Sequence, residues 1–225
     1  MSYIIRIITV GLLSVGISAA AVVSLDFTGV ATTTNATTVG GFYNGGISGN
    51  GNTGTNFGVS FSNNARVYNR YNGCCEPDSA SGTKGILFFT DGAEVTLTYA
   101  AGFSDGFSFY YSSQSESSTI KVFDGLNGTG NVLATLSLVQ QGTSSCPPGG
   151  TGIYCNWTPI GVILAGVAKS IDFGGVATLV GFDNITFGSE TPQTGVPEPS
   201  SVVMGFAGLS VIATLGRRKL NMAGK

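Results

Sequence analysis

The sequence predicts an all-β fold, an antiparallel β-sandwich with the jelly roll as its expected form. Three observations indicate this class. Short segments between residues 22 and 187 alternate apolar and polar residues, the pattern of strands that bury one face. Turn dipeptides, among them Asp91-Gly92 and Asp105-Gly106, separate these segments. The same region shows no helical period long enough to indicate a helix, and the lack of a fixed repeat argues against a β-helix.

About ten strands are predicted, each from its own alternation. In the first, Val23, Leu25 and Phe27 share one face. The Gly-, Asn- and Thr-rich stretch 31–56 comes next and predicts a long loop with one weak strand near 41–43. The other strands are predicted at 57–61, 86–90, 94–99, 107–111, 119–123, 132–139, 157–164, 170–173 and 179–187.

Residues 1–21 have the organisation of a signal peptide. A single cation, Arg6, precedes an apolar core at 7–17, and Ala19-Ala20-Ala21 offers small residues for cleavage before Val22. An uncleaved membrane anchor is the alternative, because the charge ahead of the apolar core is weak. Export would leave an ectodomain, 22–188, that is long enough to bury a core.

The stretch 189–200 is rich in Pro, Thr and Ser and predicts a linker between the ectodomain and the apolar C-terminal segment. It contains the motif Val196-Pro197-Glu198-Pro199. Proline fixes its own φ and pushes the preceding residue into an extended conformation, so the motif is a stiff ribbon that a processing enzyme could grip.

The segment 201–219 predicts a transmembrane helix. It holds an uncharged apolar run, 202–215, and ends on the cations Arg217, Arg218 and Lys219. Three consecutive cations place the tail 220–225 in the cytoplasm by the positive-inside rule. The alternative is a buried core helix that ends in a basic cap.

The proline motif, the apolar run and the three final cations follow one another in this order over 196–219. Together they resemble the PEP-CTERM sorting signal of exopolysaccharide-producing Gram-negative bacteria. The resemblance implies export, anchoring in the membrane by the C-terminal helix, processing by an exosortase-type enzyme, and delivery to the cell surface or extracellular matrix. Gly-rich segments within 42–61, 122–130 and 181–187 also look like PEP-CTERM ectodomains. That likeness implies a shared sandwich and no particular activity.

Composition excludes several kinds of chemistry. Charged residues make up 10% of the chain, its formal net charge is −2, and no basic patch lies outside the termini, which argues against nucleic-acid binding. The absence of histidine excludes Ser-His-Asp and Cys-His catalysis and imidazole metal sites. No cofactor or metal is expected. Asp26 and Asp183 lie on the first and last strand candidates, but no D-x-D-x-D-G loop supports a calcium site.

Four cysteines, Cys74, Cys75, Cys146 and Cys155, lie in the exported segment and predict two disulfides. We favour cross-links between the 74–75 turn and the 146–155 loop. A local Cys146–Cys155 bond with a vicinal Cys74–Cys75 bond is the alternative, followed by free thiols or a metal site. The spacing does not form the paired C-x2-C knuckles of a zinc site.

Aromatic residues beside these cysteines are the candidate carbohydrate contacts. Trp157 with Asn156 comes just after Cys155, and Tyr68 with Tyr71 precedes Cys74, so disulfides between the two loops would bring both pairs together. Sugar rings stack on aromatic faces, and amide groups complete the contacts. The alternative is that Trp157 is a core residue of the strand that it opens.

The sequence therefore predicts a non-catalytic surface or matrix protein that associates with extracellular polysaccharide. One alternative is a carbohydrate-active hydrolase with a carboxylate pair drawn from Glu76, Asp78 and Glu94. Another is a purely structural or adhesion protein of the matrix without a ligand site.

Overall fold

The structure is a computed structural model that describes residues 22–32, 35–69, 85–113, 115–142, 154 and 156–194. The predicted signal peptide, the PEP motif and the predicted transmembrane segment lie outside the described residues. The four cysteines lie outside them as well. Within the described ranges, no helix has the length and apolarity needed to cross a membrane.

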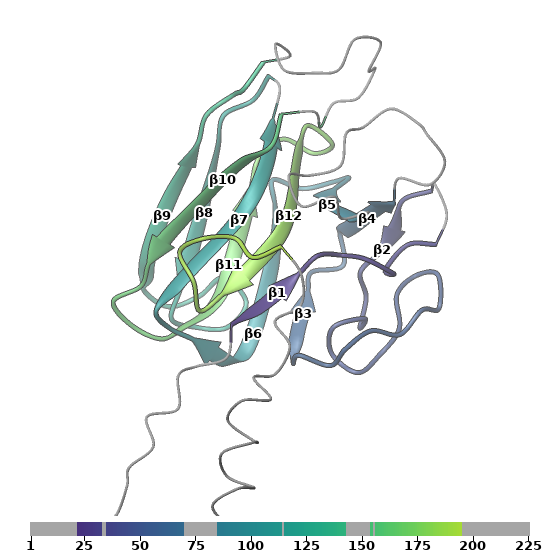
Figure 1. Cartoon of the computed structure of the whole chain (residues 1–225), viewed down its shortest axis with the longest axis horizontal. Coiled ribbons are helices and arrows are strands. Elements are labelled where there is room, and N and C mark those ends of the chain that lie inside the picture. The colour runs from purple at the N-terminus through teal and green to yellow at the C-terminus, as the bar shows by residue number, and fades with distance from the viewer. Residues whose placement is uncertain are drawn as a thin grey trace, which may run out of the picture.

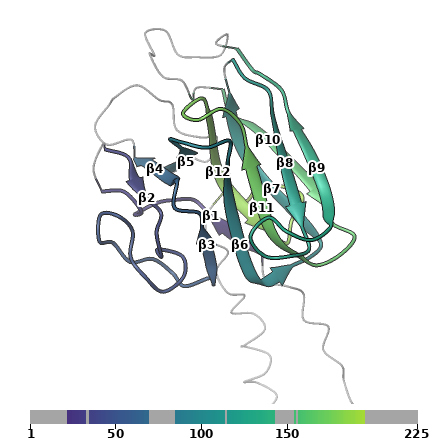
Figure 2. The same ribbon diagram turned by 180° about the vertical axis from the view of Figure 1, so that it is seen from behind.

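Two antiparallel sheets confirm the predicted β-sandwich, and Figures 1 and 2 show them from opposite sides. The core between the sheets is built from the alternating apolar residues of their inner faces. The strands are β1 (Val23–Leu25), β2 (Thr37–Thr38), β3 (Val59–Phe61), β4 (Ala65–Asn69), β5 (Gly85–Phe89), β6 (Glu94–Phe103), β7 (Gly106–Ser113), β8 (Ser118–Phe123), β9 (Val132–Leu138), β10 (Thr158–Ile163), β11 (Ala168–Gly174) and β12 (Val180–Phe187).

Strands that follow one another in the chain tend to belong to different sheets. The seven-stranded sheet runs β10-β7-β12-β5-β4-β2, with β1 paired to β12 beside this path, and the five-stranded sheet runs β3-β6-β11-β8-β9. From β5 onward, strands that are consecutive in the chain mostly lie in different sheets. Most connections therefore pass from one sheet to the other, and most paired strands are distant from each other in the sequence.

One edge of β12 is shared by two partners. Its first half pairs with β5 through Phe182 and Leu87, and its second half pairs with β1, where Ile185 lies opposite Leu25. Between them, Asn184 has a φ of 49° and the register against β7 shifts. This bulge bends β12, so that the first and last strands of the domain become neighbours.

Phenylalanines fill the centre of the core. Phe173 of β11 lies edge-on to Phe182 of β12, with 4.9 Å between ring centroids, and edge-on to Phe109 of β7 at 5.5 Å. All three side chains are fully buried. Burial of each such ring contributes about 1.5–3 kcal/mol, and edge-to-face pairing adds to it. These contacts hold the two sheets together.

The segment between β1 and β5 differs from the prediction. The weak strand predicted near 41–43 is wrong: these residues form a turn, in which Gly41 N–H donates to Ile47 O over 2.9 Å. The strand of this region is β2, which pairs with β4. β4 itself was not predicted, because only Ala65 and Val67 face the core and both are short side chains.

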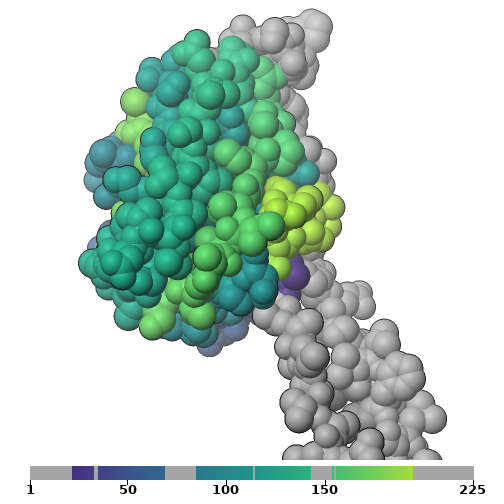
Figure 3. Space-filling view, turned by 90° about the vertical axis from the view of Figure 1, so that its left-hand side faces the viewer, coloured from purple at the N-terminus to yellow at the C-terminus, as the bar shows by residue number. Residues whose placement is uncertain are grey.

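After β12 the chain folds back over the outer face of the seven-stranded sheet. We call 189–193 the strap, and Figure 3 shows this region in yellow against the side of the domain. Gln193 O accepts from Ser24 Oγ at 3.1 Å and from Asn184 Nδ2 at 3.0 Å. Gln193 N–H donates to Thr186 Oγ1 at 3.0 Å. The first residues of the predicted linker are therefore bound to the sandwich.

Candidate functional site

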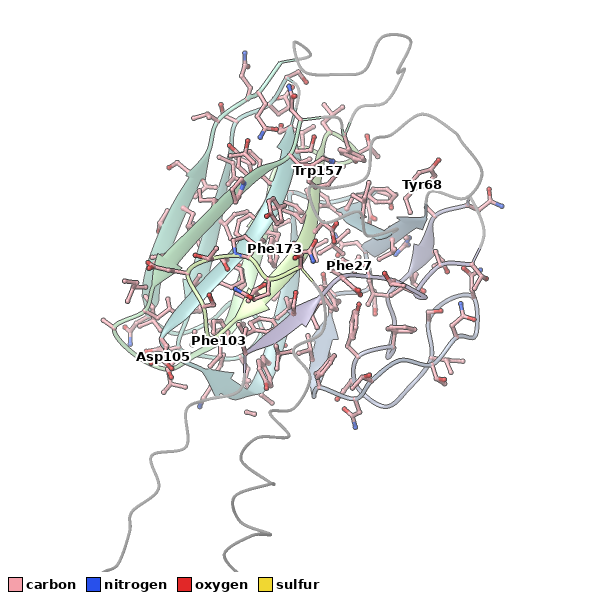
Figure 4. The ribbon with its side chains drawn as sticks, in the orientation of Figure 1. Phe27, Tyr68, Phe103, Asp105, Trp157 and Phe173 are labelled. Carbon is pink, nitrogen blue, oxygen red and sulfur yellow. The ribbon has the colours of Figure 1, made fainter. Side chains whose placement is uncertain are left out.

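The first candidate surface lies on the outer face of the seven-stranded sheet. Ile86 and Phe88 of β5 form a small buried cluster with Tyr154, separate from the main core. Tyr68 of β4 and Trp157, just before β10, are partly buried against this cluster. We call these five residues the aromatic patch. Figure 4 shows Trp157 and Tyr68 at the same end of the domain.

Tyr154 holds the segment before β10 against the sheet. Its hydroxyl donates to the backbone carbonyl of Thr178 over 2.8 Å, and its ring centroid lies 6.4 Å from that of Phe88. The ring lies over β12 at Gly181, where a Cβ atom would come within 2.9 Å of Tyr154 Cδ1. Glycine at this position lets the tyrosine approach the strand closely.

Two amide side chains fix the same segment further along. Asn156 Nδ2 donates to the backbone carbonyl of Gly142 over 2.9 Å. Gln141 Nε2 donates to Thr158 Oγ1 over 2.6 Å, while Gln141 Oε1 accepts from the backbone N–H of Ser113 over 2.8 Å. Trp157 therefore lies between two anchored residues, and its side chain packs against the cluster of Ile86, Phe88 and Tyr154.

The structure brings together two of the four predicted carbohydrate contacts. Tyr68 and Trp157 share the aromatic patch, and Trp157 is neither a core residue of β10 nor fully exposed. The NH2 group of Asn156 donates to the backbone and so serves to position Trp157. Tyr71 lies outside the described residues, as do the cysteines whose disulfides were predicted to join the two loops.

The sequence reasoning missed the buried base of the patch. The signal was present, because β5 reads Gly-Ile-Leu-Phe-Phe and is buried at every position. A continuous apolar run indicates a strand covered on both faces. Tyr154 could not have been placed in the same way, because it lies in a connection and not in a strand.

Of the three carboxylates proposed for a hydrolase, only one can be placed. Glu94 is exposed at the start of β6, and Glu76 and Asp78 lie outside the described residues. In the part of the chain that the structure describes, no three acidic or cysteine side chains gather closely enough to hold a metal ion.

The outer face of the five-stranded sheet is polar and partly covered by the loop that joins β8 to β9. Thr98 Oγ1 donates to Asn127 Oδ1 over 3.0 Å, and Gly128 N–H donates to Ser170 Oγ over 2.9 Å. A cavity of about 240 Å³ lies beside this loop, between Ser60, Thr96 and Asn127. Thr96 Oγ1 also donates to Asp172 Oδ1 over 2.7 Å, and Ser170 Oγ donates to the carbonyl of Gly125 over 2.6 Å, so these hydroxyl groups already bond within the protein.

No protein-family model matches the chain, and a search of curated proteins found no relative. Among solved structures, a family 43 arabinoxylan arabinofuranohydrolase from Bacillus subtilis in complex with cellotetraose aligns with 46% of this chain at 19% identity and a TM-score of 0.31. This chain spans only 21% of that protein.

Two further solved structures show similar partial likeness. The K2 cleaved adhesin domain of Lys-gingipain aligns with 58% of this chain and 89% of its own length, at 9% identity and a TM-score of 0.37. A Clostridium thermocellum xylanase 10B with its CBM22-1 and GH10 modules, complexed with xylohexaose, aligns over 59% of this chain and 26% of its own length at 14% identity and a TM-score of 0.34. Because the sequence identities and TM-scores of these structures are low, the fold of this chain is assigned from its own strand pairings alone.

Proposed function

We propose that the protein is an exported surface or matrix protein whose β-sandwich binds extracellular polysaccharide through the aromatic patch, without cleaving it. One observation carries the proposal. Two aromatic side chains from distant parts of the chain, Tyr68 and Trp157, are partly exposed on one buried base. Paired rings on a rigid base suit stacking against successive sugar rings, because little conformational entropy is lost on binding.

We propose further that β5 to β12 form the jelly roll that the sequence predicts. Their order, β10-β7-β12-β5 in one sheet and β6-β11-β8-β9 in the other, supports this topology. In this arrangement β2, β3 and β4 extend the edges of the eight-stranded unit, and β1 pairs with the second half of β12.

The proposed route is export by 1–21, anchoring by 202–215, and processing by an exosortase-type enzyme near Val196-Pro197-Glu198-Pro199. The resemblance of 196–219 to PEP-CTERM signals supports it. The packing of the ectodomain is compatible with it, because the hydrogen bond between Ser24 and Gln193 holds the two ends of the described domain together. Mass spectrometry of surface material tests this route. Recovery of an intact C-terminus through Lys225 would contradict processing.

The binding experiment uses the full chain, purified in mild detergent, and the host's own polysaccharide. Co-sedimentation measures binding, and size-exclusion chromatography measures polymer length. Bound polymer of unchanged length is the expected result. Shortened polymer would indicate the hydrolase, and absence of binding would indicate a purely structural protein.

Substitutions then test the aromatic patch. Trp157→Ala and Tyr68→Ala should each weaken binding by about tenfold or more, the equivalent of about 1.4 kcal/mol. Tyr99→Ala is the control, since Tyr99 is partly buried on β6 in the other sheet. It should lower the thermal midpoint and leave binding unchanged. Equal loss of binding in all three variants would show that stability, and not the patch, governs it.

A further inference from the structure

A second concave site lies apart from the aromatic patch, near the end of β1. Three separate segments line it: the chain from Ser24 to Gly29, the turn at Phe42 and Tyr43, and residues 53–57. Its volume is about 340 Å³. We call it the rim pocket. Ligand pockets commonly measure about 300–1,000 Å³, so the rim pocket is at the small end of this range and suits one ring-sized group.

Hydrogen bonds fix the walls of the rim pocket relative to each other. The backbone N–H of Phe27 donates to the Tyr43 hydroxyl over 2.9 Å, which joins the first segment to the second. The carbonyl of Tyr43 accepts from the backbone N–H of Phe57 over 2.9 Å, which joins the second to the third. The pocket is therefore built before a ligand enters, and a ligand does not have to order it.

The rim pocket combines an aromatic wall with a polar rim. Phe42 and Tyr43 are almost fully buried in edge-to-face contact, with 4.9 Å between centroids, and Phe57 is partly buried beside them. The side chains of Thr28, Thr53 and Thr55 are exposed around the opening. Such a lining matches a ring with an apolar face and a hydroxyl-bearing edge, which is the chemistry of a pyranose.

Charge restricts which sugar can enter. Asp26 lines the rim pocket, is partly exposed, and uses Oδ1 to accept from the backbone N–H of Thr28 over 3.1 Å. None of the described residues that line the pocket is Lys or Arg. A carboxylate can accept hydrogen bonds from two sugar hydroxyls, whereas it repels a uronate or a sulfate.

We propose that the rim pocket is a second carbohydrate site, selective for a neutral sugar residue, with Asp26 as its hydroxyl acceptor. Sugar as the ligand class rests in part on the proposed function, but the location and the selectivity rest on the pocket itself. With the aromatic patch, it gives the domain two separate contacts, so that one molecule can bridge polysaccharide chains.

The test uses methyl glycosides of glucose, mannose and galactose, each paired with its uronide, which differs only at C6. Binding to the full chain in detergent is followed by NMR shifts of Phe42 and Phe57. At least one neutral glycoside should bind, and its uronide should bind at least about tenfold more weakly. Failure of all neutral glycosides, or equal binding of a uronide, would overturn the proposal.

Variants separate the rim pocket from the aromatic patch. Thr53→Phe fills the mouth from an exposed position and should abolish glycoside binding, and Asp26→Asn, which keeps an acceptor for Thr28, should weaken it by about tenfold. Asp105→Asn, at an exposed turn with a φ of 70° that asparagine tolerates, is the matched control and should change nothing.

Trp157→Ala should leave glycoside binding at the rim pocket intact while polysaccharide binding falls. If Trp157→Ala abolished glycoside binding and Thr53→Phe did not, the rim pocket would be ruled out although the proposed function held. If Thr53→Phe abolished glycoside binding and Trp157→Ala left polysaccharide binding intact, the rim pocket would hold and the patch assignment would fail.

Discussion

The phenolic oxygen of Tyr43 accepts a hydrogen bond from the backbone N–H of Phe27 over 2.9 Å, and both residues are buried. Phe27 has a φ of 56°, in the left-handed region that costs energy for a residue other than glycine. The turn after β2 thus stabilises the strained residue just beyond the end of β1, at the wall of the rim pocket.

Tyr43→Phe should lower the free energy of unfolding by about 1–3 kcal/mol, because the buried N–H of Phe27 loses its acceptor. Urea denaturation measures the change. Tyr99→Phe, at a partly buried tyrosine of β6, is the matched control and should stay within about 0.5 kcal/mol of the parent protein. Equal effects of both substitutions would show that the Phe27 hydrogen bond does not matter.

Stability should fall in alkali. Burial raises the pKa of Tyr43 well above its ordinary value, and the carboxylate of Asp26 raises it further. Burial also raises the pKa of Tyr111. Above about pH 10 the unfolded chain releases these protons first, so the native state loses stability as pH rises, by at most about 1.4 kcal/mol per pH unit for Tyr43. Urea denaturation at a series of pH values from 7 to 11 should show a free energy of unfolding that is first constant and then declines. The decline should be shallower in Tyr43→Phe.

The strap should detach when Gly161 gains a side chain. A Cβ atom at this position of β10 would overlap the carbonyl of Glu190. In Gly161→Ala, the Gln193 amide, which donates to Thr186, should therefore exchange its hydrogen at least about tenfold faster. Gly166→Ala is the matched control, because its nearest neighbour would be Leu133 Cδ2 at 3.8 Å. Unchanged exchange in Gly161→Ala would mean that the strap moves aside without loosening.

Two adjacent serines of β7 should respond in opposite ways. Ser112 Oγ is buried without a hydrogen-bond partner among the residues that the structure describes, whereas Ser113 Oγ donates to the carbonyl of Glu116 over 2.7 Å. Ser112→Ala should leave stability unchanged or raise it by about 1 kcal/mol, and Ser113→Ala should lower it by about 1 kcal/mol. Thermal and urea unfolding of the two variants provide the measurement. A loss of stability in both variants would show that Ser112 Oγ has a hydrogen-bond partner after all.

The loop between β8 and β9 should be stabilised by the ionised carboxylate of Asp124. The side-chain amide of Asn131 lowers the pKa of the Asp124 carboxyl, and the Asn131 backbone N–H, 2.7 Å from Oδ1, lowers it further. The ionised form is therefore favoured in the native state, and its contribution is present above about pH 4 and lost as pH falls through the lowered pKa. NMR titration of Asp124 should show the pKa rising towards its ordinary value in Asn131→Ala. Asn127→Ala, in the same loop, should leave it unchanged.

Most strands could be predicted because the signal is local. In β6, for example, Val95 and Leu97 alternate with Thr96 and Thr98, and this pattern suffices to define a strand and its buried face. β4 was not predicted because its two core residues, Ala65 and Val67, have short side chains, and its other face carries Arg66 and Tyr68. Tyr68 and Trp157 could be recognised as candidate contacts from their residue type and their neighbours in the sequence. The buried residues beneath them could not be identified in this way.

The sequence by itself determined the all-β class, several of the turns, such as those at Asp91-Gly92 and Asp105-Gly106, the exclusion of histidine chemistry and the expectation of a sorting signal. All of these depend on residue type and on spacing along the chain. Only the tertiary structure decided that β12 pairs with β7, β5 and β1, that Tyr154 covers Gly181, and that Phe42 and Asp26 line one pocket. These contacts join residues far apart in sequence, and the packing that selects them leaves no periodic trace in the sequence itself.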